Sequence, residues 1–250
     1  MSTALPPTPP HPLMPELYRD NAQKREWLRR IFDDTATDYD RVERWVSLGS
    51  GRWHRRQALA RAGLSSGMRV ADIACGTGLL AREAVSLVGP TGSVLGVDPS
   101  EGMLAEARRT LGIQTVSGVA DALPLPPASF DFVSLGYALR HIEDLGAAFA
   151  EFFRVLSPGG RVCILEITRP SSRMGRTLLK GYLTIMSSAL LRLHPGAART
   201  GELWKYYWQT IDQCVRPDRV TSALQAAGFE HILHRKVLGV FSEYVGQRPL

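Results

Sequence analysis

Two glycines behind an apolar run form the part of this sequence best suited to hold a small molecule. Residues 70–81 read V-A-D-I-A-C-G-T-G-L-L-A, which indicates a buried strand, a turn and the start of a helix. Gly76 and Gly78 allow backbone conformations and a close ligand approach that a Cβ would block. The free amides at the start of the helix would point at the ligand. The spacing G-x-G-x-x-A predicts a nucleotide-type pocket, but alone it does not say which nucleotide binds.

Three aspartates around this turn indicate the ligand. Asp72 lies at the end of the predicted strand, where it can meet a cationic group, and Asp98 ends the next apolar run at a spacing that suits a ribose diol. Asp121 follows the third predicted strand, where an adenine amino group would lie. No lysine or arginine occurs between Arg69 and Arg82, so the turn is not built around a phosphate. A site with several hydrogen-bond acceptors and few cationic side chains suits S-adenosylmethionine, which carries an aminocarboxylate, a ribose, an adenine and a sulfonium.

The predicted cofactor site combines these acids with backbone and apolar positions of the same loops. Its members are Asp72, Ala74, Cys75, Gly76, Gly78, Asp98, Pro99, Met103, Ala120, Asp121, Ala122 and Gly136. The three cysteines, at positions 75, 163 and 214, lack the spacing of metal ligands, so no metal site is predicted.

The elements that must position these residues alternate along the chain. Strands are predicted at residues 70–74, 93–98, 114–117, 130–135 and 161–167, and helices at residues 79–88, 100–111, 146–156, 172–193, 202–213 and 217–227. Two last strands, 230–238 and 241–247, are joined by too few residues for a crossover and must pair antiparallel. The prediction is a Rossmann-like α/β fold: a seven-stranded, mostly parallel sheet with a C-terminal antiparallel hairpin and helices on both faces. Such an ending is unusual for a nicotinamide domain and disfavours an oxidoreductase.

Length and composition predict one domain. The chain has 250 residues, 44% of them hydrophobic and 22% charged, which is enough for one sizeable core. Residues 1–20 are rich in proline and are predicted to be a disordered tail, with residues 21–250 forming the domain. Within the domain, residues 21–62 are predicted to be an N-terminal helical cap and residues 172–213 a helical lid or acceptor-binding insertion. For residues 174–193 a lid, a homodimer face and a membrane-surface helix all stay open.

The formal net charge of +6 raises the question of a nucleic-acid partner. Its best local support is the cluster Arg52, His54, Arg55 and Arg56. Between residues 25 and 44, however, arginines recur at helical spacing among acids that include Asp33, Asp40 and Glu43, which is typical of a solvated face. No nucleic-acid partner is therefore predicted, whereas attraction to an anionic membrane surface stays open.

No apolar run approaches the roughly 20 residues that a membrane-spanning helix needs. The three cysteines form no even disulfide framework. Together these features predict a cytoplasmic protein, with peripheral association with a membrane left open.

Several longer motifs occur in order along the chain. They are V-A-D-I-A-C-G-T-G, L-G-V-D-P-S-E-G-M-L, A-D-A-L-P-L-P, F-D-F-V-S-L-G-Y-A-L-R and R-V-L-S-P-G-G-R-V-C-I-L-E. They resemble the motifs of class I S-adenosylmethionine-dependent methyltransferases. Within that class the chain is similar to the ubiquinone and menaquinone biosynthesis C-methyltransferases over roughly residues 31–247. The resemblance implies an enzyme that transfers a methyl group from S-adenosyl-L-methionine to a lipophilic aromatic or quinol-type small molecule at carbon, with S-adenosyl-L-homocysteine as the second product.

The resemblance also implies three catalytic residues. Arg140 matches the active-site arginine of the family and Tyr39 its N-terminal tyrosine, although the family's Gly-Leu-Arg-Asn is Ala-Leu-Arg-His at residues 138–141 here. Arg140 stays protonated at ordinary pH, so we expect it to stabilise phenolate charge. His141 is the better titratable base, and Tyr39 would orient the acceptor or cover the donor.

Each of these residues also has a purely structural interpretation. Arg140 can form a salt bridge with Glu143 or Asp144, His141 can bond to nearby backbone, and Tyr39 can be a half-buried anchor. Glu166 at the end of the fifth strand faces either the pocket or the surface. An aromatic cluster is expected to be half core and half lid over an aromatic acceptor; it contains Trp204, Tyr206, Tyr207 and Trp208.

Other functions remain as alternatives. An O- or N-methyltransferase of a natural product or other lipophilic small molecule would share the fold and differ only in the acceptor pocket. A nucleic-acid methyltransferase is disfavoured, because no Asn-Pro-Pro-Tyr or Pro-Cys motif follows the fourth strand. The remote alternative is a non-catalytic partner protein that binds S-adenosylmethionine only to stabilise an assembly.

Overall fold

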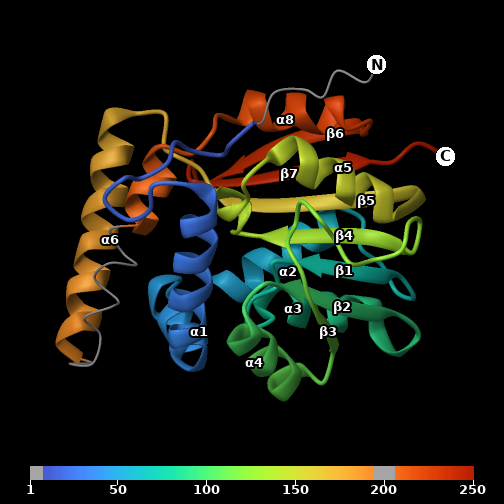
Figure 1. The fold of residues 1–250 in the computed structure, drawn as a ribbon, viewed down its shortest axis with the longest axis horizontal. Helices are drawn as coiled ribbons and strands as arrows, with labels where there is room; N and C mark the ends of the chain where they lie inside the picture. The colour runs from blue at the N-terminus through green and yellow to red at the C-terminus, as the bar shows by residue number, and fades with distance from the viewer. Residues whose placement is uncertain (1–7, 194–205) are drawn as a thin grey trace.

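One mixed sheet organises the computed structural model, which describes residues 8–193 and 206–250. The strands of these residues follow the order β3-β2-β1-β4-β5-β7-β6 (Figure 1). Their bounds are β1 Arg69–Ile73, β2 Ser93–Asp98, β3 Gln114–Ser117, β4 Phe130–Gly136, β5 Leu156–Ile167, β6 Glu230–Val237 and β7 Phe241–Gln247. Pairing is parallel from β3 to β5 and antiparallel from β5 through β7 to β6. The predicted fold class is confirmed.

Helices cover both faces of the sheet. On one face α2 (Gly51–Arg61) and α3 (Leu79–Val88) enclose an apolar cluster with alternate strand residues such as Val70 and Phe132. On the other, α5 (Leu145–Val155) and α8 (Pro217–Ala226) pack on the intervening residues, among them Ile73 and Val133. Each central strand is therefore apolar on both sides, as a covered parallel sheet requires.

Most predicted elements have the expected bounds, since capping signals mark their ends. In α4 (Glu101–Leu111), Ser100 caps the first turn by accepting a hydrogen bond from the amide of Met103, and Gly112 ends the helix in the left-handed conformation. The fifth strand differs from the prediction: it begins at Leu156 and not at Arg161. Residues 157–160, between the predicted helix and strand, form a bulge at which the pairing of β5 with β4 shifts register.

The predicted disorder of residues 1–20 is wrong for residues 8–20; residues 1–7 lie outside the described residues. Met14 and Tyr18 are buried. The carbonyl of Thr8 accepts a hydrogen bond from the amide of Leu145, and that of Pro10 accepts one from Val215. Proline removes a donor but keeps its carbonyl, so an extended proline-rich segment can still pack and accept hydrogen bonds.

The predicted cap of residues 21–62 consists of two helices with different positions. The first, α1 (Asn21–Val46), lies beside the carboxyl ends of the parallel strands (Figure 1). It ends where Leu48 and Gly49 take positive φ angles of 50° and 77°. The second helix, α2, belongs to the layer on the sheet, and only its first turn reaches the same edge of the sheet as α1.

The predicted lid of residues 172–213 is described in two parts. The long helix α6 (Arg173–Leu193) runs along the side of the molecule beyond α1 (Figure 1). Residues 206–212 are also helical, whereas Trp204 of the aromatic cluster lies outside the described residues. In the described part of the chain no helix has both the length and the apolar character needed to cross a bilayer.

Candidate active site

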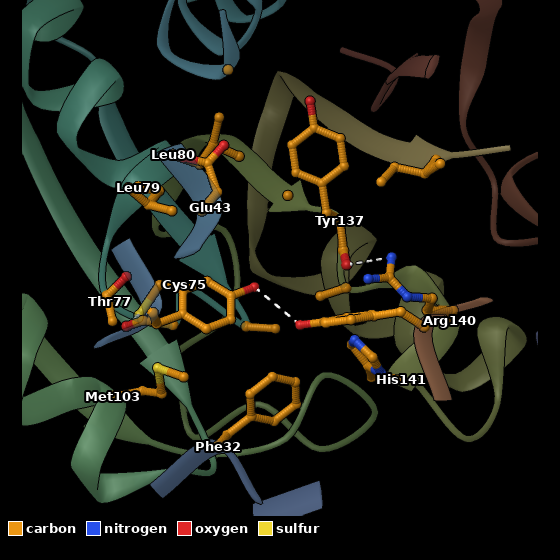
Figure 2. A pocket seen from close by; sticks show the side chains of 18 of the residues that line it. Phe32, Glu43, Cys75, Thr77, Leu79, Leu80, Met103, Tyr137, Arg140 and His141 are labelled. Atoms are coloured by element: carbon orange, nitrogen blue, oxygen red, sulfur yellow. Dashed lines mark hydrogen bonds between the residues drawn. The ribbon is translucent and has the colours of Figure 1, made fainter. Parts of the chain in front are cut away.

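A large cavity opens at the carboxyl ends of the parallel strands, between them and α1. Its volume is about 1410 Å³. Sites for a single small molecule usually measure about 300–1,000 Å³, so this cavity has room for two ligands side by side. The labelled side chains in Figure 2 divide it into two regions, with Cys75, Thr77 and Met103 in one and Arg140 and His141 in the other.

Asp72 is the buried acid of the first region. Its Oδ1 accepts a hydrogen bond of 2.6 Å from the hydroxyl of Ser134, while Oδ2 has no hydrogen-bond partner within the described residues. Burial raises the pKa of this carboxyl to about 7, although the bond from Ser134 acts in the opposite direction. A buried carboxylate oxygen without a partner is costly unless a ligand supplies a donor. The ammonium group of S-adenosylmethionine would be such a donor.

The turn itself is held open by backbone conformation. Ala74 and Gly76 have positive φ angles of 50° and 55°. The amide of Gly76 donates to Asp98 Oδ2 and the amide of Ser100 to Oδ1, both at 2.9 Å. Burial raises the pKa of Asp98 to about 6. Since each carboxylate oxygen has a second lone pair, Asp98 can hold the turn and still accept hydrogen bonds from a ribose diol.

Ten of the twelve residues predicted to bind the cofactor line the cavity. They are Asp72, Ala74, Cys75, Gly76, Asp98, Pro99, Met103, Ala120, Asp121 and Gly136. At Gly136 a Cβ would lie 3.0 Å from Leu80 Cδ2, so a larger residue there would require Leu80 to move. Burial raises the pKa of the Cys75 thiol well above its ordinary value, so this residue is an apolar filler.

Gly78 and Ala122 do not line the cavity. Gly78 has a φ of 87° at the start of α3, and a Cβ there would lie 2.5 Å from Leu111 Cδ1. It serves the packing of α4 against the turn. The amide of Ala122 donates to the carbonyl of Val119 at 3.2 Å in a local turn.

The second region is organised around Arg140, whose side chain is 4% exposed. Its Nη1 donates to Glu166 Oε1 at 2.6 Å and to the carbonyl of Tyr137 at 2.8 Å. Its backbone amide donates to the other oxygen of Glu166 at 3.1 Å. The guanidinium also lies 5.0 Å from the centre of the Tyr207 ring. Burial alone would lower the pKa of Arg140, but Glu166 raises it above the ordinary value, so the group is cationic.

Arg140 pairs with Glu166 and not with Glu143 or Asp144, the two partners that the sequence suggested. Glu143 pairs with Arg25 at 2.6 Å, and Asp144 caps α5 by accepting from the amide of Gly146 at 2.9 Å. Glu166 neither faces the cavity nor lies on the surface; it is 1% exposed beneath Arg140. Arg140 thus combines a structural ion pair with a place in the cavity wall.

His141 and Tyr39 also line the cavity. The Nδ1 of His141 lies 2.6 Å from the hydroxyl of Tyr206, and the two rings are stacked with centres 5.5 Å apart. Burial, and next the charge of Arg140, lower the pKa of His141 well below 6.5, so its ring is neutral and weakly basic. The hydroxyls of Tyr39 and Tyr207 lie 3.5 Å apart.

Two acids of α1, Asp33 and Asp40, are not part of the solvated face that the spacing predicted, whereas Asp38 is, with a side chain 61% exposed. Asp33 accepts hydrogen bonds from the Ser100 hydroxyl at 2.6 Å and from a backbone amide at the start of α4. Asp40 accepts from the Thr77 hydroxyl at 2.5 Å. These contacts join α1 to the glycine turn, through Thr77, and to the start of α4. They link residues far apart in the chain, so helical periodicity alone could not reveal them.

Sequence reasoning also missed a polar group on another wall of the cavity. His54 and Arg55, which the sequence placed in a basic cluster, are only 7% and 5% exposed. Both line the cavity together with Tyr137 and Glu43. Within the described residues no group of three or more His, Cys, Asp or Glu side chains is arranged to hold a metal ion.

Solved structures share this fold. One is a SAM-dependent methyltransferase from Aquifex aeolicus, with a TM-score of 0.58 and 18% identity over 77% of this chain and 88% of that one. Another is phosphoethanolamine N-methyltransferase 2 from Haemonchus contortus in complex with S-adenosyl-L-methionine, with a TM-score of 0.63 and 19% identity over 91% of this chain and 60% of that one. At such identities the likeness establishes the fold alone.

Sequence comparison reaches further. Residues 19–248 match the model of the ubiE/COQ5 methyltransferase family. A demethylmenaquinone methyltransferase from Symbiobacterium thermophilum is 32% identical over 90% of this chain and 94% of its own. A ubiquinone/menaquinone biosynthesis C-methyltransferase UbiE from Hahella chejuensis is 33% identical over 82% and 84%. The chain therefore belongs to the ubiE/COQ5 methyltransferase family and is an S-adenosylmethionine-dependent methyltransferase.

Proposed function

We propose that this enzyme methylates a ring carbon of a lipophilic hydroquinone-type acceptor. The relatives named above are quinone-biosynthesis methyltransferases. The observation that carries the proposal is the buried cation of Arg140, fixed by Glu166 in the wall of the same cavity that holds the glycine turn. A ring carbon is nucleophilic when its phenol is phenolate-like, and a preorganised cation lowers the energy of that state.

The side chains of the second region suit this chemistry. The donor supplies a methyl group on a sulfonium, so transfer is an in-line displacement that needs alignment and exclusion of water. Phe32, Tyr39 and Tyr207 line the acceptor side with aromatic surface. Arg140 would stabilise the phenolate oxygen, and neutral His141 would accept a hydrogen bond or the ring proton that is lost after transfer.

Exposed apolar residues at the mouth of the cavity suggest how such an acceptor enters. Leu48, Trp53 and Leu238 line the cavity and are nevertheless 75%, 64% and 86% exposed. We propose that they contact a lipid surface, from which the acceptor passes into the cavity. For α6 a lid, a homodimer face and a membrane-surface helix all stay open, and a cytoplasmic location stays a prediction.

Product analysis tests the proposed function. The enzyme is incubated with methyl-labelled S-adenosylmethionine and 1,4-naphthohydroquinone under anaerobic conditions, and the product is examined by mass spectrometry and NMR. We expect the label on a ring carbon. A label on oxygen would favour the O-methyltransferase alternative, and absence of turnover with hydroquinones and other phenols would contradict the proposal.

A further inference from the structure

Arg140 and His141 lie on a turn that has little regular structure of its own. Leu139–His141 is a single 3-10 turn, and α5 begins only at Leu145. We call residues 139–144 the Arg140 turn. Glu166 fixes its start, because this carboxylate binds both the backbone amide and the guanidinium of Arg140. The contacts that fix the rest of the turn come from residues 8–24.

Residues 8–18, which we call the N-terminal strap, lie beside this turn. In Figure 1 the strap is dark blue and passes from the neighbourhood of α8 to the start of α1. It precedes residues 19–248, which match the family model, so membership of the family does not explain its position. None of the strap residues lines the cavity. Any effect of the strap on the chemistry must therefore pass through the residues that it contacts.

Backbone hydrogen bonds join the start of the strap to the end of the Arg140 turn. The amide of Thr8 donates to Asp144 Oδ1 at 3.1 Å, and the carbonyl of Thr8 accepts from the amide of Leu145, also at 3.1 Å. The same Asp144 oxygen caps α5 by accepting from the amide of Gly146. Asp144 therefore ties the strap, the turn and the first residues of α5 together.

Lys24, in the first turn of α1, holds the middle of the Arg140 turn. This lysine is buried, and its Nζ donates to the carbonyl of Ile142 at 3.1 Å. Burial lowers the pKa of Lys24 to about 8, although Glu143 and Asp121 act in the opposite direction. The side chain is thus mostly cationic at neutral pH. Without it the buried carbonyl of Ile142 would lose this partner, and the turn would have to move to find another.

His11 gives the strap a fixed shape beside the turn. Its Nδ1 lies 2.7 Å from the carbonyl of Pro12. Burial, and next the charge of Lys24, lower the pKa of His11 to about 4, while the backbones of Pro12 and Arg140 act in the opposite direction. The ring is therefore neutral at ordinary pH. Because a carbonyl only accepts hydrogen bonds, Nδ1 carries the proton and donates to Pro12.

The end of the strap supports His141 through a row of aromatic rings. The Tyr18 ring lies 6.1 Å from that of Trp27, and the Trp27 ring lies 4.9 Å from that of Tyr206. Tyr206 stacks on His141, and its hydroxyl lies 2.6 Å from Nδ1 of the imidazole. Met14 belongs to the same buried apolar cluster as these tyrosines. Packing of the strap therefore limits where the ring next to His141 can lie.

We propose that the N-terminal strap and Lys24 are positioning elements of the active site, which hold the Arg140 turn so that Arg140 and His141 face the methyl acceptor. The inference rests on the proposed function, which assigns the chemistry to these two residues. Lys24, like the strap, does not line the cavity, so it acts through the turn and not on the substrate. Displacement of a positioned group by about 1 Å can cost about 100-fold in rate, so small shifts of the turn should be measurable.

Two pairs of variants in the full chain test the two kinds of contact. Thr8→Pro removes the amide that donates to Asp144, in a segment already extended by the prolines at positions 7 and 9, whereas Thr8→Ala keeps that amide. Lys24→Met removes the donor to Ile142 and keeps an unbranched stem. Lys236→Met is its control, because Lys236 also donates to a carbonyl, that of Arg169, but at an exposed site far from the turn in sequence.

Hydrogen–deuterium exchange of residues 139–145, in the complex with S-adenosylhomocysteine, measures how firmly the turn is held without requiring turnover. We expect faster exchange there in Lys24→Met and Thr8→Pro and native exchange in Lys236→Met and Thr8→Ala. With S-adenosylmethionine and 1,4-naphthohydroquinone, kcat should fall about 10- to 100-fold in Lys24→Met and about three- to tenfold in Thr8→Pro. The affinity for S-adenosylhomocysteine should stay native in all four variants.

A merely structural role would lower the melting temperature and leave both the exchange of residues 139–145 and kcat native at temperatures well below it. Native exchange in Lys24→Met and Thr8→Pro, or native kcat in variants whose turn exchanges faster, would overturn the proposal. Absence of turnover by the native enzyme, with faster exchange confined to these two variants, would count only against the proposed function.

Discussion

At the scale of single residues, the two regions of the cavity use burial in opposite ways. Burial raises the pKa of the Asp72 carboxyl to about 7. One of its oxygens has no hydrogen-bond partner among the described residues, so the group is suited to a cationic ligand. Arg140 is equally buried, but Glu166 holds it charged. The region of Asp72 is therefore stabilised when a cationic ligand binds, whereas the region of Arg140 presents a positive charge that Glu166 already stabilises.

Replacement of Arg140 tests its charge and its geometry. Lysine keeps the charge but cannot contact both Glu166 and the Tyr137 carbonyl with one planar group. We expect Arg140→Lys to lower kcat about 100-fold, the usual effect of removing one stabilising donor, with unchanged affinity for S-adenosylhomocysteine. Arg216→Lys, in an exposed ion pair with Asp218 that does not line the cavity, is the control and should behave as the native enzyme. Native kcat in Arg140→Lys would rule out the assigned role.

Asp72 makes donor binding and stability depend on pH in different ways. Its folded pKa, about 7, lies above the ordinary value of 3.8, so the folded protein binds the extra proton. The Asp72 contribution to the free energy of unfolding therefore falls as pH rises from about 4 to 7 and stays low above that. We expect Asp72→Asn to raise the melting temperature of the ligand-free protein at pH 8, since it removes a buried charge.

The same variant should bind S-adenosylmethionine about 10- to 100-fold more weakly at pH 8, because the ammonium group loses its carboxylate. In the native enzyme, affinity should fall as pH drops below about 7, and this dependence should be reduced in Asp72→Asn. Calorimetry across pH 5.5–8.5 measures both. Equal affinity of the two proteins at pH 8 would contradict a role of Asp72 in donor binding.

At the scale of elements, glycines determine how closely helices approach the turn. Gly78 and Gly112 both have positive φ angles, 87° and 65°, but a Cβ on Gly78 would meet Leu111 whereas Gly112 has no neighbouring atom within 4 Å. Gly112→Ala should therefore cost about 1 kcal/mol of stability from backbone strain alone. Gly78→Ala should cost about 2–4 kcal/mol, because the Leu111 side chain must also move, and it should weaken donor binding where the turn is displaced. Urea unfolding measures the difference, and equal losses would contradict the packing role of Gly78.

At the scale of the whole molecule, the cavity mouth is the surface that we expect to meet lipid. Trp53→Ser and Leu238→Ser should reduce co-sedimentation with vesicles that contain anionic lipid, while leaving the affinity for S-adenosylhomocysteine unchanged. Leu233→Ser is the matched control, because Leu233 is also exposed, at 67%, but does not line the cavity. Equal vesicle binding by all three variants and the native protein would show that this surface does not contact lipid.

The sequence alone determined the strands of the sheet, the glycine turn that would bind S-adenosylmethionine, and the family. These depend on local signals: apolar runs, the caps at Ser100 and Gly112, and the acids at strand ends, Asp72 and Asp98, which the parallel order of the strands must bring together. Only the tertiary structure decided the partners of the acceptor region. These partners are side chains from distant segments: Glu166 contacts Arg140, Asp40 contacts Thr77, and His54 lies between Tyr137 and Glu243. Their contacts depend on how helices pack across the sheet, and the periodicity of residues along the chain does not predict that packing.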